Sequence, residues 1–315
     1  MAFETLLGND RLKQNLQESL SKNHISPFYL ISGPGGSGKR TLAGLLTAAI
    51  LCKGASRPCG TCEACRKLRS ENHPDVITVT DPEHKHVAVK IVRQIREDVF
   101  IRPNESDYKI YIFPQDLGTE GQNALLKILE EPPKHGIFLL LTDNPEKILP
   151  TVRSRCTELK LQALPEPVLT AALAREFPGS TREDVAAAAV RSGGFLGQAR
   201  QLLENGAGIP PQTEGFAEAL AGKNALLLAE TLAPMEKWKR EELTQILQSW
   251  LELTEEALVC RSGLEAVSPL SRKLGRSRTA PELHAAACAL KQALSYTLSN
   301  VSPAAVCGWL VWALR

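Results

Sequence analysis

The feature that most constrains the fold of this chain is a glycine-rich loop, Gly33-Pro34-Gly35-Gly36-Ser37-Gly38-Lys39. Residues 28–31 before the loop are predicted as a short buried strand, and residues 41–51 after it as an apolar helix. Strand, glycine-rich turn and helix form the context that a phosphate-binding loop requires. Backbone N–H groups and the positive end of the helix dipole then face a phosphate, and Lys39 reaches its outer oxygens. The sequence therefore predicts an α/β P-loop domain.

The position after Lys39 breaks the usual pattern of such a loop. It should carry a Ser or Thr hydroxyl that binds Mg²⁺, and here it is Arg40. Thr41 comes one residue late, and neighbouring helical residues point about 100° apart, so Thr41 does not simply replace the hydroxyl. Binding of ATP with Mg²⁺ therefore stays open, and the alternative is a retained loop that binds nothing. The candidate nucleotide-binding residues are Gly33, Gly35, Gly36, Gly38, Lys39 and Thr41.

Four cysteines follow the loop closely and have the spacing of a metal site. They are Cys52, Cys59, Cys62 and Cys65. Four thiolates suit a tetrahedral Zn²⁺ ion and leave no open coordination position, so the predicted zinc site is structural. Pro58 and Gly60 supply the tight turns that such a module needs. The alternative is four ordinary buried thiols. Three of the remaining cysteines lie in apolar helical surroundings and are expected in the core: Cys260, Cys288 and Cys307.

Composition excludes several classes of protein. The chain has 315 residues, of which 43% are hydrophobic, enough to bury a substantial core in two or three domains. No N-terminal signal segment and no long apolar run is present, so we expect a cytoplasmic protein with no membrane contact. The formal net charge of +2 is too small to argue for DNA binding by itself.

Strands and helices are predicted to alternate up to about residue 160 and to give way to helices afterwards. Near-continuous apolar strands alternating with helices indicate a parallel sheet that is covered on both faces. The expected strands are residues 76–79, 109–113, 137–142 and 157–161, and the expected helices between them are residues 89–100 and 119–129. Residues 166–205 are predicted as a small helical unit, and the chain from about residue 212 as long helices.

Three further motifs give the chain a resemblance to a known family. They are Asn72-His73-Pro74-Asp75, the run from Asn123 to Pro133 (NALLKILEEPP), and Ser154-Arg155-Cys156. Together with the P-loop and the cysteines they resemble the bacterial DNA polymerase III clamp-loader family of AAA+ ATPases. The resemblance implies an α/β AAA+ P-loop domain at 1–163 with an inserted zinc module at about 52–73. It also implies a small helical lid at 164–207 and an all-α C-terminal collar for oligomerisation at 208–315.

Within that family, several departures favour a delta-prime-like subunit over the ATP-hydrolysing tau/gamma subunit. The strand at residues 109–113 should lead into the Asp-Glu pair of a Walker B motif, but Pro114-Gln115 stands there. Gln198 occupies the position where the resemblance places a phosphate-sensing Arg. The N-terminal residues lack the Arg-Pro arm of tau/gamma. With Arg40 added, the groups that handle metal, water and phosphate are all altered.

Arg155 is the residue to which the resemblance assigns chemistry. In the family this Arg reaches the γ-phosphate of ATP bound to a neighbouring subunit, and a permanently charged, fork-shaped guanidinium suits that task. Arg153 competes for the role. The resemblance implies a hetero-pentamer with delta and tau/gamma subunits that loads the sliding clamp onto primed DNA. The chain would be part of the DNA polymerase III holoenzyme, a nucleotidyltransferase complex, without catalytic activity of its own.

Two other functional classes remain open on the sequence. One is an active tau/gamma-type ATPase that tolerates Arg40 and uses Asp116 for Mg²⁺. The other is a zinc module for nucleic-acid binding on a P-loop scaffold, against which the weak net charge argues. The basic stretch at 271–278 is expected to be a loop, solvated or in contact with DNA phosphates.

Overall fold

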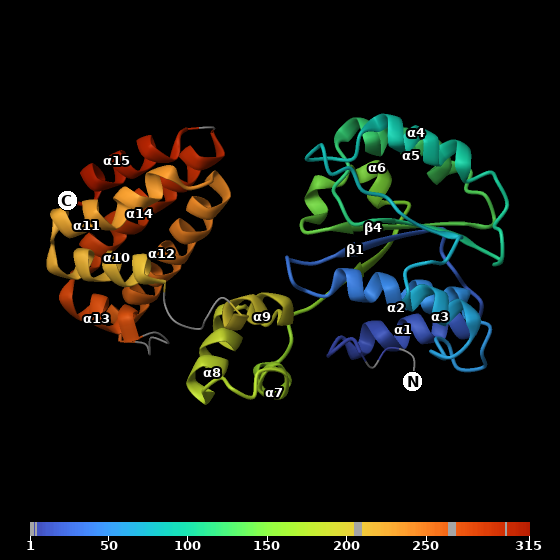
Figure 1. Cartoon of the computed structure of the whole chain (residues 1–315), viewed down its shortest axis with the longest axis horizontal. Helices are drawn as coiled ribbons and strands as arrows, with labels where there is room; N and C mark the ends of the chain where they lie inside the picture. Colours follow the sequence, from blue (N-terminus) through green and yellow to red (C-terminus); the bar gives the residue numbers. More distant parts are fainter. Residues whose placement is uncertain (1–2, 4, 205–209, 264–268, 300) are drawn as a thin grey trace. The chain divides into compact units, whose positions relative to one another are not determined.

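The computed structural model describes residue 3 and residues 5–204, 210–263, 269–299 and 301–315. These residues form two compact units, Met1–Leu203 and Glu204–Arg315 (Figure 1). Within the described residues, no helix combines the length and the apolar character needed to cross a membrane.

A five-stranded parallel sheet organises the first unit. The strands are β1 (Phe28–Ser32), β2 (Val76–Thr78), β3 (Lys109–Phe113), β4 (Gly136–Thr142) and β5 (Thr157–Lys160), and their order in the sheet is β2-β3-β4-β1-β5. Every pairing is parallel. All residues of β1 and β4 are buried, which explains why these strands are continuous apolar runs without alternation. The predicted parallel α/β sheet is confirmed.

Helices cover both faces of this sheet (Figure 1). One face carries α1 (Asp10–Ser21), α2 (Lys39–Leu51) and α3 (Glu63–Arg69), and the other carries α4 (Val89–Asp98), α5 (Thr119–Glu130) and α6 (Pro150–Arg153). Successive residues of a strand point to opposite faces, so Ile31 joins the core under α2 while Leu30 joins the core under α4 and α5. The expected helix over 89–100 ends earlier, at Asp98, and Phe100 beyond it is exposed.

The rest of the described chain is helical. The sheet is followed by α7 (Glu166–Glu176), α8 (Arg182–Arg191) and α9 (Leu196–Glu204). The second unit contains α10 (Pro211–Gly222), α11 (Ala225–Leu232), α12 (Arg240–Arg261), α13 (Pro269–Ser277), α14 (Ala280–Leu298) and α15 (Pro303–Ala313). Short 3-10 turns occur at η1 (Pro145–Lys147) and η2 (Ala233–Lys237).

The core of the second unit is centred on Trp250. Its ring stacks on Phe216 with centroids 4.3 Å apart, and its indole N–H donates to the Thr213 hydroxyl at 3.1 Å. Two expectations about this unit were wrong. The stretch at 271–278 is largely the helix α13 and not a loop, because Leu274 is fully buried and anchors one face of it. Cys288 lies exposed on α14 instead of in the core, whereas Cys307 is buried.

Candidate functional site: a P-loop cavity and a four-cysteine cluster

The glycine-rich loop joins the end of β1 to the start of α2, as the sequence predicts. Gly36 and Gly38 have φ angles of 73° and 95°, in the left-handed region that favours glycine. The N–H of Gly33 donates to the carbonyl of Thr142 at 3.2 Å, which ties the start of the loop to the end of β4. The local backbone therefore has the turn that a phosphate-binding loop needs.

The ammonium group of Lys39 is already bonded within the chain. It donates to the carbonyl oxygens of Gly33 at 2.6 Å and Pro34 at 2.9 Å, and it forms an ion pair with the carboxylate of Asp143. A lysine ammonium has three N–H donors, and these three acceptors use them all. Asp143, the first residue after β4, was missed by the sequence reasoning because its partner lies far away along the chain.

A cavity of about 630 Å³ lies against the loop. Its wall combines the loop and the start of α2 with Leu6 and Leu7 from the N-terminal segment and with residues 194–197 before and within α9. Leu164 and Phe195 add to the apolar side of the cavity. The candidate residues Gly35, Gly36, Gly38, Lys39 and Thr41 line this cavity. The candidate Gly33 does not line the cavity; its carbonyl accepts a hydrogen bond from the Lys39 ammonium.

The start of α9 is docked directly on the loop. The N–H of Gly197 donates to the carbonyl of Gly36 at 2.9 Å. A Cβ atom on Gly197 would lie 2.6 Å from the Cα of Gly36, so both glycines are required for this approach. The backbone N of Gln198 would lie 2.5 Å from a Cβ on Gly36. Gln198 thus sits beside the loop, and its role as a replaced phosphate sensor stays a prediction.

Arg200, also on α9, lines the same cavity and was missed by the sequence reasoning. Its Nε and one terminal nitrogen each bond to the Glu176 carboxylate at 2.6 Å. A bidentate pair of this kind fixes the guanidinium in one orientation. The helical spacing that places Arg200 one turn after Gly197 was the available sequence signal.

The residues that follow β3 offer no free carboxylate to a metal ion in the cavity. Pro114 lines the cavity and offers no carboxylate. Gln115 is used structurally: its carbonyl accepts from the N–H of Asp81 at 2.7 Å, and its amide donates to the carbonyls of Asp81 at 3.0 Å and His84 at 2.6 Å. Asp116 accepts from the Thr142 hydroxyl at 3.3 Å and pairs with Lys147. Among the described residues that line the cavity, Asp143 therefore carries the one carboxylate.

The four predicted cysteine ligands do converge. Their Sγ atoms all lie within 4.8 Å of one another, and those of Cys52 and Cys62 are 3.9 Å apart. A tetrahedral ion with Zn–S bonds of about 2.3 Å places its sulfurs about 3.8 Å apart, so the geometry fits zinc. The N–H groups of Gly54 and Cys59 donate to the Cys52 sulfur at 3.3 Å, but burial outweighs these hydrogen bonds and raises the pKa of the Cys52 thiol.

The thiols of this cluster have divergent acidities. Hydrogen bonds from Thr61 lower the pKa of Cys59 to about 5. Burial raises the pKa of Cys65 to about 12. Metal ligation requires thiolates, so the first sulfur is ready for a metal and the second would lose its proton on binding. The four-cysteine cluster is thus a candidate closed metal site, with Cys52 and Cys65 buried and Cys59 and Cys62 partly exposed.

Arg155 lies on the surface between α6 and β5. Its guanidinium donates to the carbonyl of Thr151 at 2.9 Å, and its side chain is 41% exposed and 3.7 Å from Glu130. The competitor Arg153 pairs with two carboxylates, Glu146 at 2.9 Å and Glu158 at 3.3 Å. Of the two arginines, Arg155 therefore has the weaker ion pairing with carboxylates of its own chain.

The family motif around Asp75 proves to be structural. The Asp75 carboxylate is fully buried and accepts hydrogen bonds from the backbone N–H groups of Asn104, Glu105 and Ser106. The Asn104 side chain donates to it as well, at 3.1 Å. His73 accepts the backbone N–H of Asp75 through Nδ1 at 3.2 Å. The motif thus ties the segment after the cysteine cluster to the loop that precedes β3.

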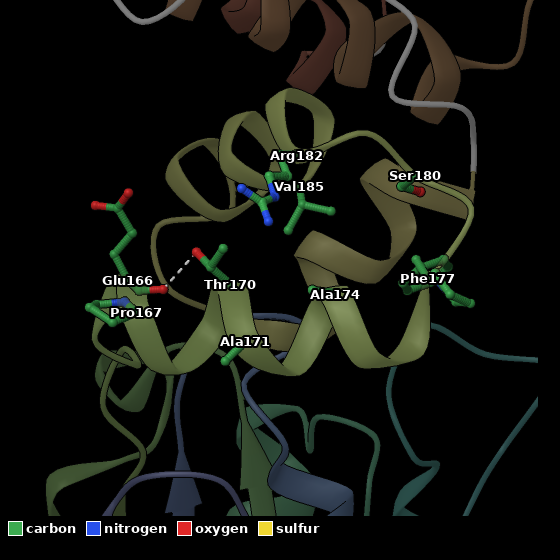
Figure 2. A pocket seen from close by; sticks show the side chains of 10 residues that line it. Glu166, Pro167, Thr170, Ala171, Ala174, Phe177, Ser180, Arg182 and Val185 are labelled. Carbon is green, nitrogen blue, oxygen red and sulfur yellow. Dashed lines mark hydrogen bonds between the residues drawn. The ribbon is translucent and has the colours of Figure 1, made fainter.

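A separate hollow of about 740 Å³ lies on α7 and α8, away from the P-loop (Figure 2). Ala171 and Ala174 of α7 and Val185 of α8 line it together with Phe177, which follows α7, and its polar groups come from Glu166, Thr170, Ser180 and Arg182. One of them, the Thr170 hydroxyl, is satisfied by the carbonyl of Glu166 at 2.8 Å. This hollow brings no set of catalytic or metal-binding groups together.

Fold and site define a P-loop α/β protein with a four-thiol module at the far end of the helix that follows its phosphate loop. Residues 8–165 match the family described as DNA polymerase III, delta subunit. The chain belongs to this bacterial clamp-loader family, and the resemblance seen in the sequence is confirmed.

Curated relatives include more than one kind of clamp-loader subunit. The chain is 37% identical to DNA polymerase III subunit gamma/tau of Mycobacterium tuberculosis over 201 residues, which are 61% of this chain and 35% of that protein. It is 34% identical to subunit delta' of Bacillus subtilis over 157 residues, 49% of this chain and 47% of that protein. A gamma-subunit-related protein of Thermotoga maritima superposes with a TM-score of 0.46 at 18% identity, covering 95% of this chain and 98% of that one. The chain therefore spans about half or less of the length of these curated relatives.

Proposed function

We propose that this chain is a delta-prime-like subunit of the replicative DNA polymerase III clamp loader. It would act in the cytoplasm, in a hetero-pentamer with delta and tau/gamma subunits that loads the sliding clamp onto primed DNA. The observation that carries the proposal is the P-loop cavity. It keeps the loop backbone and Lys39, yet Arg40 and Pro114 line it where the resemblance expects metal-handling groups.

Such a cavity does not support hydrolysis of ATP. Phosphoryl transfer needs a metal bridging the outer phosphates and a group that orients the attacking water. The Gln115 side chain is hydrogen-bonded to the backbone of Asp81 and His84. The Asp116 carboxylate accepts from the Thr142 hydroxyl and pairs with Lys147. An Mg²⁺ ion contributes several kcal/mol of transition-state stabilisation, so its loss abolishes useful turnover.

Arg155 gives this subunit its part in the chemistry of the complex. Its exposed guanidinium would complete the ATP site of an adjacent subunit and stabilise charge on the γ-phosphate there. Zinc held by the four cysteines would be structural, since four thiolates close the coordination sphere. In this assignment 1–163 is the AAA+ domain, 164–207 the lid and 208–315 the collar.

The second candidate is a tau/gamma-type ATPase subunit. It is favoured by the longer match to gamma/tau of Mycobacterium tuberculosis, over 201 residues against 157 for delta' of Bacillus subtilis. The cavity argues against it, because Asp143 is the one carboxylate in its described lining and is paired with Lys39.

The test is the ATPase rate of the reconstituted loader that contains this full chain. Arg155→Ala should lower turnover at the adjacent ATP site by about 10³-fold or more, the range typical of an arginine supplied in trans, and so remove that site's share of the DNA-stimulated rate of the complex. Arg153→Ala is the matched control and should leave the rate near wild type, because the Arg153 guanidinium forms ion pairs with Glu146 and Glu158 within the chain. An assembled Arg155→Ala complex that hydrolyses at the wild-type rate would refute the assignment. Steady ATPase activity of the isolated chain that disappears in Lys39→Ala would favour the tau/gamma reading.

A further inference from the structure

The lining of the P-loop cavity departs from that of a magnesium-dependent triphosphate site in two respects. Arg40 replaces the hydroxyl that would bind the metal, and it is exposed at the cavity without a partner among the described residues. Asp143 stands against Lys39, where an outer phosphate would otherwise be. Each departure changes which anion the cavity accepts.

Arg40 supplies positive charge from the protein itself. A metal ion in a P-loop offsets the charge of the phosphates, and a guanidinium does the same without a metal while adding fork-shaped N–H donors. The described lining offers Asp143 as its one carboxylate, and the ammonium of Lys39 already holds that group. A set of oxygen ligands for Mg²⁺ is therefore missing from this lining, whereas cationic donors for phosphate are present.

Asp143 sets a limit on the length of the phosphate chain. The three donors of Lys39 are bonded to Gly33, Pro34 and Asp143, so a γ-phosphate would have to displace the carboxylate or lie beside a like charge. A β-phosphate can instead be held by the N–H groups of the loop and the start of α2. The side of the cavity built by Leu6, Leu7 and Leu164 is apolar, as the flat face of a nucleobase requires.

We propose that this cavity is a magnesium-independent site for a nucleoside diphosphate, from which Asp143 excludes the γ-phosphate. The inference rests on the proposed non-hydrolysing function and deepens it. A bound diphosphate would fill the space between the loop and α9 and hold the docked arrangement of Gly36 and Gly197. Because the proposed subunit does not hydrolyse ATP, a nucleoside diphosphate can stay bound in the cavity without Mg²⁺.

The experiment is isothermal titration of the full chain with ADP and with ATP, each in Mg²⁺ and in EDTA. ADP should bind with equal affinity in both buffers and about tenfold more tightly than ATP, since Asp143 is 63% exposed and its repulsion is screened. Asp143→Asn should bring the affinities for ADP and ATP together. Asp116→Asn is the matched control, because Asp116 does not line the cavity, and should keep the preference for ADP.

Arg40→Thr tests the second half of the inference. Restoring a hydroxyl and removing the guanidinium should weaken ADP binding in EDTA about tenfold, and Mg²⁺ should recover part of that loss. Binding of ADP to the wild-type chain that Mg²⁺ strengthens tenfold or more would overturn the inference, as would ATP binding as tightly as ADP. A wild-type chain that binds neither nucleotide would also overturn it. That failure would leave the loader assembly and the effect of Arg155→Ala untouched, so the two proposals are separable.

Discussion

Removal of the Asp75 carboxylate should locally unfold the connection between the cysteine cluster and the loop before β3. The carboxylate is fully buried and accepts three backbone N–H groups and one side-chain N–H, from residues 104–106. Hydrogen bonds to a charged group contribute about 1.5–3 kcal/mol each, but they are not additive. Asn104 and Glu105 are exposed, so water replaces part of the lost interaction. We therefore expect Asp75→Ala to cost about 3 kcal/mol.

Asp75→Asn gives an intermediate case, since it keeps one acceptor oxygen and loses the charge. We expect about half the cost of the alanine substitution, about 1.5 kcal/mol. The measurement is the free energy of opening at the amides of residues 104–106 from hydrogen exchange, because a chain with two compact units does not unfold as one two-state system. Asp107→Asn, an exposed residue of the same loop, is the control and should change little. A loss below about 0.5 kcal/mol in Asp75→Ala would refute the reasoning.

The same carboxylate predicts a pH dependence. Burial raises the pKa of Asp75, but the hydrogen bonds from residues 104–106 outweigh that effect and hold its pKa below the ordinary value. A depressed pKa means that the stabilisation is present above the unfolded pKa of about 3.9 and is lost as pH falls through the folded pKa. The difference between wild type and Asp75→Asn in opening free energy should therefore stay constant from about pH 8 to pH 5 and shrink below about pH 4. A difference that grows on acidification would contradict this account.

The remaining predictions concern metal, packing and backbone contact. Elemental analysis should give about one zinc per chain, and its removal by a chelator should unfold the 52–73 segment while leaving the helical second unit intact; full retention of structure without zinc would exclude a structural metal. Trp250→Ala should cost the second unit about 3–5 kcal/mol in chemical denaturation, because the fully buried ring stacks on Phe216. Gly197→Ala should loosen the contact of α9 with the P-loop and raise amide exchange at Gly36. The control Gly44→Ala, where a Cβ meets nothing within 4 Å, should stabilise α2 by about 0.5–1 kcal/mol.

Local patterns in the sequence were sufficient for the elements and for the cysteine cluster. Continuous apolar runs predicted the buried strands, and the spacing of Cys59, Cys62 and Cys65 predicted that their sulfurs would meet. Both signals act over a few residues, so periodicity and turn residues determine them. Where local signals were weak, the predictions were wrong. The stretch at 271–278 was predicted as a loop, but most of it lies in α13, because packing of Leu274 in the core stabilises a helix there.

Only the tertiary structure decided what surrounds the phosphate loop. Asp143 reaches Lys39 because β4 lies beside β1 in the sheet, and α9 reaches Gly36 although it follows the whole sheet in the chain. In the sequence, Gln115 stands where the resemblance expects a Walker B carboxylate. In the fold, its side chain forms hydrogen bonds with Asp81 and His84. Such pairings join residues that are distant in sequence, and their geometry depends on strand order and packing, which no local pattern encodes.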